Sequence, residues 1–151
     1  MWAKLRRFSA LPRAAKRDFV QAALLMPLIR VSLRLRGFRA TQESLQSRVG
    51  GGAAGLSEAS AADETKQVCR MVVAAARYSP ISSTCLERSL TLWWLLARRG
   101  IATQLRIGAR KSGDKFEAHA WVERNGEAIG EPEGTHLHYG AFAKEFSGEI
   151  F

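Results

Sequence analysis

The sequence predicts an α+β fold in which a buried helix that carries a cysteine packs on a small antiparallel sheet that carries a histidine, preceded by an N-terminal helical arm. Three observations lead to this prediction. The segment from Cys85 to Arg99 is apolar on most sides, as in a helix at the centre of a domain. After Gly100 the apolar period changes from about 3.6 to about 2 residues, which indicates strands. A glycine-rich stretch separates these elements from a basic N-terminal segment.

The N-terminal arm is expected to be helical over residues 12–36. Pro27 lies inside this segment and predicts a kink, and Gly37 is the expected stop. The helix would carry two overlapping apolar rows, made of Phe19, Val20, Ala23 and Met26 and of Leu24, Leu28, Val31 and Leu35. We expect the chain to have three parts: a basic helical arm over 1–49, a flexible Gly/Ala/Ser connector over 50–61, and a body over 62–151.

The body is expected to begin with a helix over about 65–77, which Asp63 would cap and Ser79-Pro80 would end. The next helix, over about 85–99, has possible N-caps in Ser82, Ser83 and Thr84, and Gly100 suits the position after its end. Strands are predicted over about 101–110, 116–123 and 127–131, with a polar loop at 111–115 and a hairpin turn at Asn125-Gly126.

The net charge of +9 lies entirely in the arm. Residues 1–40 hold ten lysines and arginines and one acid, Asp18, whereas the 13 bases and 13 acids of residues 41–151 cancel. Such an arm is typical of contact with an acidic partner, anionic lipid or nucleic acid, and a solvated helix face explains it equally well. The neutral body lacks a basic-aromatic surface pattern, which argues against nucleic acid.

The cysteine content and the hydropathy of the sequence indicate the cellular compartment to expect. Two cysteines do not make a disulfide framework, so we expect a reduced, cytoplasmic protein. The apolar run from Phe19 to Ile29 is too short to span a bilayer, and no clear cleavage site follows it. A peripheral membrane contact through residues 12–36 stays open.

Cys85 and His119 are the candidate catalytic residues. Cys85 lies at the expected start of a buried helix, where unpaired N–H groups and the positive end of the helix dipole favour a thiolate. His119 follows 34 residues later in a predicted strand, between two alanines that leave space around the ring. A thiol and an imidazole are the two halves of a thiol-nucleophile site, provided that they meet in one crevice.

The third member of such a site depends on the register of the hairpin. With a two-residue loop at Asn125-Gly126, Glu131 is expected to face Ala120 and to lie on the wrong side of the sheet. With a three-residue loop over 124–126, Glu131 is expected directly opposite His119. A triad through Glu131 is therefore expected to require the three-residue loop.

Other residues have weaker chemical signals. Glu133 is the alternative acid for orienting His119. Trp121 alternates onto the His119 face, and with Ser83 and Thr84 it is a candidate for substrate binding. Cys69 lies among aliphatic residues, and we expect it to pack in the core.

We expect neither a metal nor a cofactor. His136 and His138 supply two imidazoles but no third ligand at a recognised spacing. The glycines at 50–52 lack the flanking strand and the lysine of a phosphate-binding loop.

Several segments together resemble the lasso-peptide leader peptidase family, and most closely the standalone C-terminal half of its B protein. The resemblance covers about residues 62–142 and is carried by segments 85–90, 95–101, 105–108, 118–123 and 125–126. It implies a transglutaminase-like, papain-like fold. It also implies that Cys85 is the nucleophile, His119 the base, and Glu131 the acid at a position where the family usually has aspartate.

The resemblance further implies a cysteine protease that removes the leader from a ribosomally made precursor peptide. A separate leader-binding protein would present the precursor, and the arm is expected either to fold over the body or to dock this protein. An ATP-dependent cyclase would then close a macrolactam ring. Two other functions stay open: an acyl transferase on the same scaffold, and a non-enzymatic adaptor with a basic docking arm.

Overall fold

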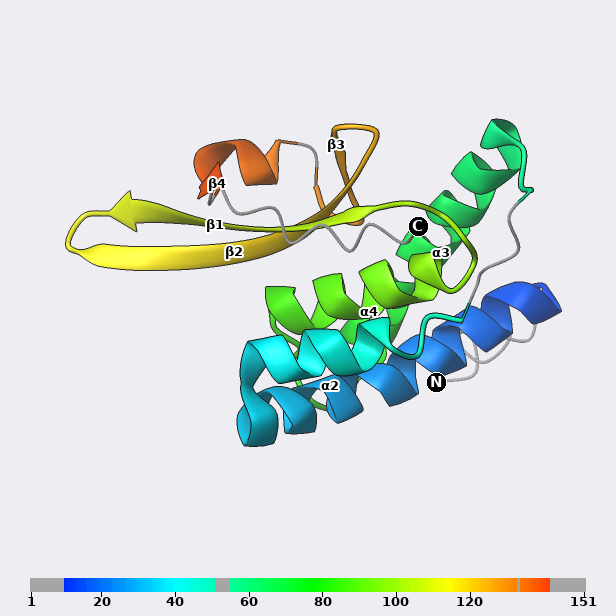
Figure 1. Ribbon diagram of the computed structural model, residues 1–151, viewed down its shortest axis with the longest axis horizontal. Coiled ribbons are helices and arrows are strands. Elements are labelled where there is room, and N and C mark those ends of the chain that lie inside the picture. Colours follow the sequence, from blue (N-terminus) through cyan, green and yellow to red (C-terminus); the bar gives the residue numbers. More distant parts are fainter. Residues whose placement is uncertain (1–9, 51–54, 133, 142–151) are drawn as a thin grey trace.

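The computed structural model describes residues 10–50, 55–132 and 134–141. Its helices are α2 (Arg13–Gln46), α3 (Glu58–Tyr78) and α4 (Cys85–Ala97). The strands are β1 (Gln104–Ser112), β2 (Lys115–Arg124), β3 (Glu127–Ile129) and β4 (Gly140–Ala141), with the short 3-10 helix η1 (Thr135–His138) before β4. The strands form one antiparallel sheet in the order β3-β2-β1-β4, so the predicted α+β class is confirmed (Figure 1).

Helix α2 is a hairpin of two helical segments. Gly37, with φ 77° and ψ 179°, is the residue inside α2 that leaves the helical region. The predicted stop at Gly37 is confirmed, because glycine tolerates the positive φ at which the chain turns, whereas Pro27 keeps helical backbone angles. The Thr41 hydroxyl donates to the Gly37 carbonyl at 2.7 Å and lies 2.9 Å from the Ser32 hydroxyl, which fastens the two segments together.

Helix α3 begins earlier than the sequence predicts. Ser57, not Asp63, is the N-cap, and its hydroxyl accepts a hydrogen bond of 3.2 Å from the Ser60 N–H. Residues 58–61 of the expected connector are therefore the first turn of α3. The helix ends at Tyr78 before Ser79-Pro80, as predicted. Residues 51–54 of the connector, 1–9 of the expected arm and 142–151 of the expected body lie outside the described residues.

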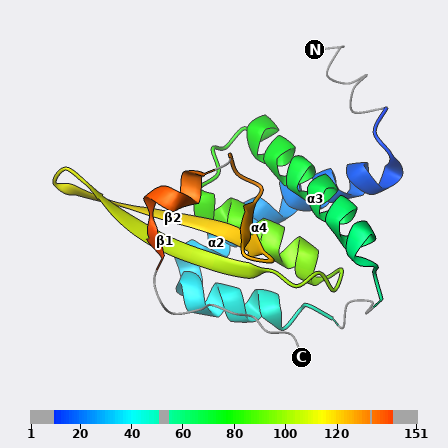
Figure 2. The same ribbon diagram turned by 90° about the horizontal axis from the view of Figure 1, so that it is seen from above.

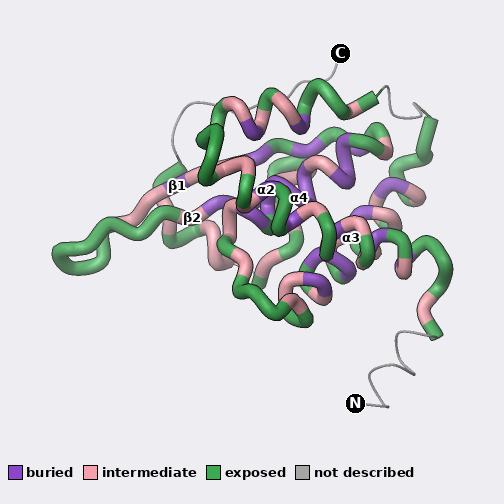
Figure 3. Tube along the Cα trace, turned by 90° about the horizontal axis from the view of Figure 1, so that it is seen from below, coloured by how far each residue is buried: buried purple, intermediate pink, exposed green. Residues whose placement is uncertain are grey.

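Helix α4 lies between α2 and the sheet, and α3 packs beside it (Figures 1 and 2). It is the most deeply buried element, and Leu90, Trp93 and Leu96 are at most 1% exposed (Figure 3). The same hydrophobic cluster contains Met26 and Ile29 from α2. The N-terminal helix therefore packs against α3 and α4 through a shared core.

A buried ion pair also joins α2 to the rest of the molecule. The carboxylate of Asp18 is fully buried, and it accepts hydrogen bonds from the Arg99 guanidinium and, at 2.9 Å, from the Gln67 amide. A buried carboxylate needs such partners to offset its lost hydration. Among the described helices, none combines the length and the apolarity that a membrane crossing requires.

Candidate active site

Cys85 is the first residue of α4, and a capping box fixes its position. The Thr84 hydroxyl accepts the Glu87 N–H at 3.2 Å, and the Glu87 carboxylate accepts the Thr84 N–H at 3.0 Å. Of the three possible caps, Thr84 is thus the one used. The arrangement leaves Cys85 beside the unpaired N–H groups and the positive dipole end of a helix.

Arg30 from α2 supports this helix start. Its guanidinium holds both oxygens of the Glu87 carboxylate, at 2.8 and 2.9 Å, and also donates to the Ser82 carbonyl. Burial alone raises the pKa of Glu87, but the hydrogen bonds from Arg30 and the Thr84 N–H outweigh it, so this pKa lies below its usual value. One carboxylate therefore joins the N-terminal helix to the segment that presents Cys85.

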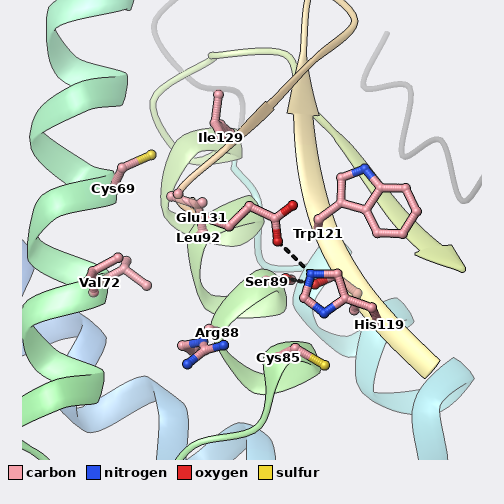
Figure 4. A pocket seen from close by; sticks show the side chains of 13 residues that line it. Cys69, Val72, Cys85, Arg88, Ser89, Leu92, His119, Trp121, Ile129 and Glu131 are labelled. Carbon is pink, nitrogen blue, oxygen red and sulfur yellow. Dashed lines mark hydrogen bonds and ion pairs between the residues drawn. The ribbon is translucent and has the colours of Figure 1, made fainter. Parts of the chain in front are cut away.

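A side chain one turn after Cys85 connects α4 to β2. The buried Ser89 hydroxyl donates a hydrogen bond of 2.9 Å to the carbonyl of Ala120, the residue after His119. Residues four apart share a helix face, so this contact brings Cys85 towards His119. Both residues line one pocket, where Figure 4 shows the sulfur lying next to the imidazole. In the described part of the chain no hydrogen bond joins them, as is common in unliganded catalytic sites.

Glu131 orients the imidazole. Its Oε2 atom lies 2.6 Å from His119 Nε2, which leaves the other ring nitrogen facing Cys85 (Figure 4). A carboxylate on one ring nitrogen stabilises the tautomer in which the other nitrogen can accept a proton. The three candidate residues Cys85, His119 and Glu131 therefore meet in one pocket.

The hairpin nevertheless has the two-residue loop. Arg124 pairs with Glu127, and Asn125 and Gly126 have φ of 52° and 81°, as expected for a tight hairpin turn. The expectation that a contact between Glu131 and His119 requires a three-residue loop is wrong. The alternation rule fails because β3 ends at Ile129, two residues before Glu131.

Gly130 makes the departure from β3 possible. Its φ is 77°, in the left-handed region that favours glycine, and a Cβ atom there would lie 2.7 Å from Leu92 Cδ2. The backbone conformation disfavours a side chain at this position, and Leu92 would have to move to make room for one. This glycine redirects the chain so that Glu131 reaches the pocket instead of continuing the strand.

Aromatic rings surround the imidazole. The ring centroids of Trp121 and Tyr139 lie 5.9 and 4.9 Å from that of His119, in stacked arrangements. Trp121 is on the His119 side as the alternation predicts, but it is only 3% exposed. Gly108, opposite His119 in β1, leaves room for the indole, since a Cβ atom there would lie 3.0 Å from the Trp121 ring.

A comparison with protein families gives the chain its family. The model of the transglutaminase-like superfamily matches residues 23–143, from the first half of α2 to just after β4. The chain belongs to the transglutaminase-like superfamily. Neither the curated proteins nor the solved structures include a match to the chain.

The matched range of this transglutaminase-like domain includes most of α2. The family domain thus extends beyond the expected body at 62–151 and contains Arg30, which supports the Cys85 segment. The domain also brings both cysteines to the same pocket. They differ in environment, because burial raises the pKa of the Cys69 thiol to about 11, which disfavours its thiolate.

Not all of the expected site residues gather in the pocket of this transglutaminase-like domain. Trp121 lines it, whereas Ser83 and Thr84 are not among its lining residues. Glu133 lies outside the described residues. In the described chain, no group of three or more histidine, cysteine, aspartate or glutamate side chains is placed to hold a metal ion.

Several residues that lie near the catalytic candidates were not predicted from the sequence. Ser89 could have been found by its position four residues after Cys85 on the same helix face. Tyr139 and His136 lie after β3, in a segment whose sequence has no regular apolar periodicity that could predict their positions. His136 Nδ1 lies 3.6 Å from the second oxygen of Glu131, and neither buried atom has a hydrogen-bond partner.

Proposed function

We propose that this transglutaminase-like protein is a cysteine peptidase that removes the leader from a ribosomally made lasso-peptide precursor. The observation that supports peptidase chemistry is the 2.6 Å contact between His119 and Glu131 in a pocket that Cys85 also lines. The support for the narrower substrate assignment is the set of sequence segments from Cys85 to Gly126 that resemble the leader peptidases.

The chemistry begins with proton transfer from the Cys85 thiol to His119. The sulfur then attacks the carbonyl carbon at the leader–core junction, and backbone N–H groups at the start of α4 stabilise the oxyanion. The imidazolium gives its proton to the departing amine of the core peptide, which leaves the leader as a thioester on Cys85. His119 then removes a proton from water, which attacks the thioester and releases the leader acid.

Glu131 keeps the imidazole in the required orientation and stabilises its protonated form through both proton transfers. Trp121 and Tyr139 flank the ring and restrict its rotation. In the proposed pathway, a leader-binding protein presents the precursor to this pocket. An ATP-dependent macrolactam cyclase then receives the freed core.

The test is to incubate the precursor with this protein and the leader-binding protein, and to follow the products by mass spectrometry. We expect two fragments whose masses sum to the precursor plus one water. Cys85→Ala should abolish the cut while it leaves binding to the partners unchanged. Cys69→Ala is the matched control, and it should retain cleavage because its thiol is largely protonated.

Two outcomes would replace the proposal. A cross-linked product with an uncut leader would indicate an acyl transferase on the same scaffold, with an amine instead of water as the second substrate. An uncut precursor with the wild-type protein, together with equal biological output from Cys85→Ala, would indicate an adaptor that does not use the thiol.

A further inference from the structure

The outer face of α2 carries an exposed aliphatic row that we call the α2 stripe. Its members are 46–80% exposed and recur about once per helical turn along one line: Val20, Leu24, Leu28, Val31 and Leu35. With a rise of about 1.5 Å per residue, the stripe is about 22 Å long. A contiguous exposed apolar surface of this kind in a folded protein marks a contact with something else.

The stripe points away from the body of the molecule. Ala22, Met26 and Ile29 on the opposite side of the same helix are at most 5% exposed and belong to the core with α3 and α4. Because α2 packs on α3 and α4 with its other face, the described chain leaves the stripe uncovered (Figures 1 and 3).

Positive charge lies along the same surface. Arg13 and Arg17 fall on the line of the stripe by helical spacing, and Arg34 and Arg36 are exposed near its other end. The acid in this part of the helix, Asp18, is buried and paired with Arg99; it also lies 3.7 Å from the exposed Arg17 guanidinium, so it offsets part of that one charge and leaves Arg13, Arg34 and Arg36 unpaired with it.

The sequence before α2 has the same character. Residues 1–9 contain three bases, Trp2 and Phe8, and no acid. Tryptophan, phenylalanine, leucine, lysine and arginine are the residue types that favour the interface between lipid headgroups and acyl chains.

We propose that α2 lies on an anionic lipid surface, with the stripe between the acyl chains and its arginines on the headgroup phosphates. A straight, convex row of aliphatic side chains fits a plane, whereas a protein partner would need a concave acidic groove of the same length. Arginine forms paired hydrogen bonds with phosphate, and each basic residue near such a surface adds attraction. This proposal does not depend on the peptidase function.

The geometry keeps the pocket accessible in the bound state. Within the described chain, the pocket-lining residues come from α3, α4, β2 and the segment 129–131, and none comes from α2. Since α4 lies between α2 and the sheet, a membrane under α2 would leave the pocket facing solution (Figure 1).

The test is flotation of the full chain with vesicles of phosphatidylcholine alone, or with about one third phosphatidylglycerol. We expect binding to the anionic vesicles, at least tenfold weaker binding to the neutral ones, and a loss of binding as salt is raised. The double variant Leu24→Glu with Leu28→Glu should lower binding at least tenfold. Phe116→Glu is the matched control, because that side chain is 79% exposed in the β1–β2 hairpin and outside the stripe.

Far-ultraviolet circular dichroism and thermal unfolding check that each variant stays folded. The proposal would be overturned if the wild-type protein did not bind anionic vesicles. It would also be overturned if the folded double variant bound them as well as the wild-type protein does. A dimer in solution that the double variant converts to monomer would assign the stripe to a second copy of this chain. Tight binding of the stripe to an acidic protein, without any vesicle binding, would assign it to a protein partner.

Discussion

The hydroxyl of Ser89 donates a hydrogen bond of 2.9 Å to the backbone carbonyl of Ala120, and this bond links the Cys85 helix to the His119 strand beside the pocket. The two catalytic candidates come from elements of different type, so their spacing depends on how α4 packs on the sheet. Ser89 is one helical turn from Cys85, and Ala120 is the neighbour of His119, so the bond adds to the hydrophobic packing of α4 in fixing that spacing at the pocket.

Ser89→Ala should therefore affect turnover more than stability. Loss of a buried hydrogen bond costs about 0.5–1.5 kcal/mol, and we expect kcat for leader cleavage to fall about tenfold. Thr91→Val is the matched control, because it removes another buried hydroxyl of α4, one that bonds only the Glu87 carbonyl at 2.7 Å. Urea unfolding and kcat are measured for both, and equal losses of turnover would show that Ser89 has no positioning role.

Glu131→Gln keeps the size of the side chain but removes its charge. The protonated imidazole then loses its carboxylate partner, and we expect kcat to fall on the order of 10²-fold or more. Glu131→Asp should also be impaired, since its shorter side chain cannot span the 2.6 Å contact without movement of the backbone. Glu127→Gln, at an exposed position in β3, controls for the loss of a carboxylate on the same segment. Wild-type turnover by Glu131→Gln would exclude this residue from the site.

Gly130→Ala tests the bend that brings Glu131 to the pocket. The new Cβ would lie 2.7 Å from Leu92 Cδ2, on a backbone with φ of 77°. We expect a loss of about 1–3 kcal/mol of stability and a fall in turnover similar to that of Glu131→Gln. Gly126→Ala has a similar φ of 81° with no neighbour within 4 Å, so it reproduces the backbone strain without the clash. The prediction fails if both alanine variants lose turnover equally.

Because of Glu87, the free energy of unfolding should depend on pH in the acid range. Its pKa is lowered in the folded protein, so its contribution is complete above the unfolded-state value of about 4.3 and disappears as pH falls through the folded-state value. Glu87→Gln should be less stable than wild type near neutral pH, and the difference should narrow on acidification. Urea unfolding across this range measures it, and a difference that grows as pH falls would contradict the assignment.

The two thiols should differ in reactivity towards iodoacetamide. Since the pKa of Cys69 is about 11, about one molecule in a thousand carries its thiolate at about pH 8. Cys85, at the helix start, should be modified first, and modification of Cys69 should appear as pH approaches its pKa. Peptide mass spectrometry identifies the modified residue, with Cys85→Ala as the control. Faster labelling of Cys69 near neutral pH would be the contrary result.

The sequence by itself determined the α+β class, the buried helix that starts at about Cys85, the stop at Gly37, and the shared side of His119 and Trp121. These features follow from periodicity, capping and glycine chemistry, which act between residues close in the chain. The tertiary structure alone decided that Glu131 reaches His119, that Arg30 supports the Glu87 carboxylate, and that Ser89 joins α4 to β2. The bend at Gly130 depends on its approach to Leu92, which lies in a different element. Such contacts form only when elements far apart in the sequence pack together, and no local sequence pattern predicts which side chains will then meet.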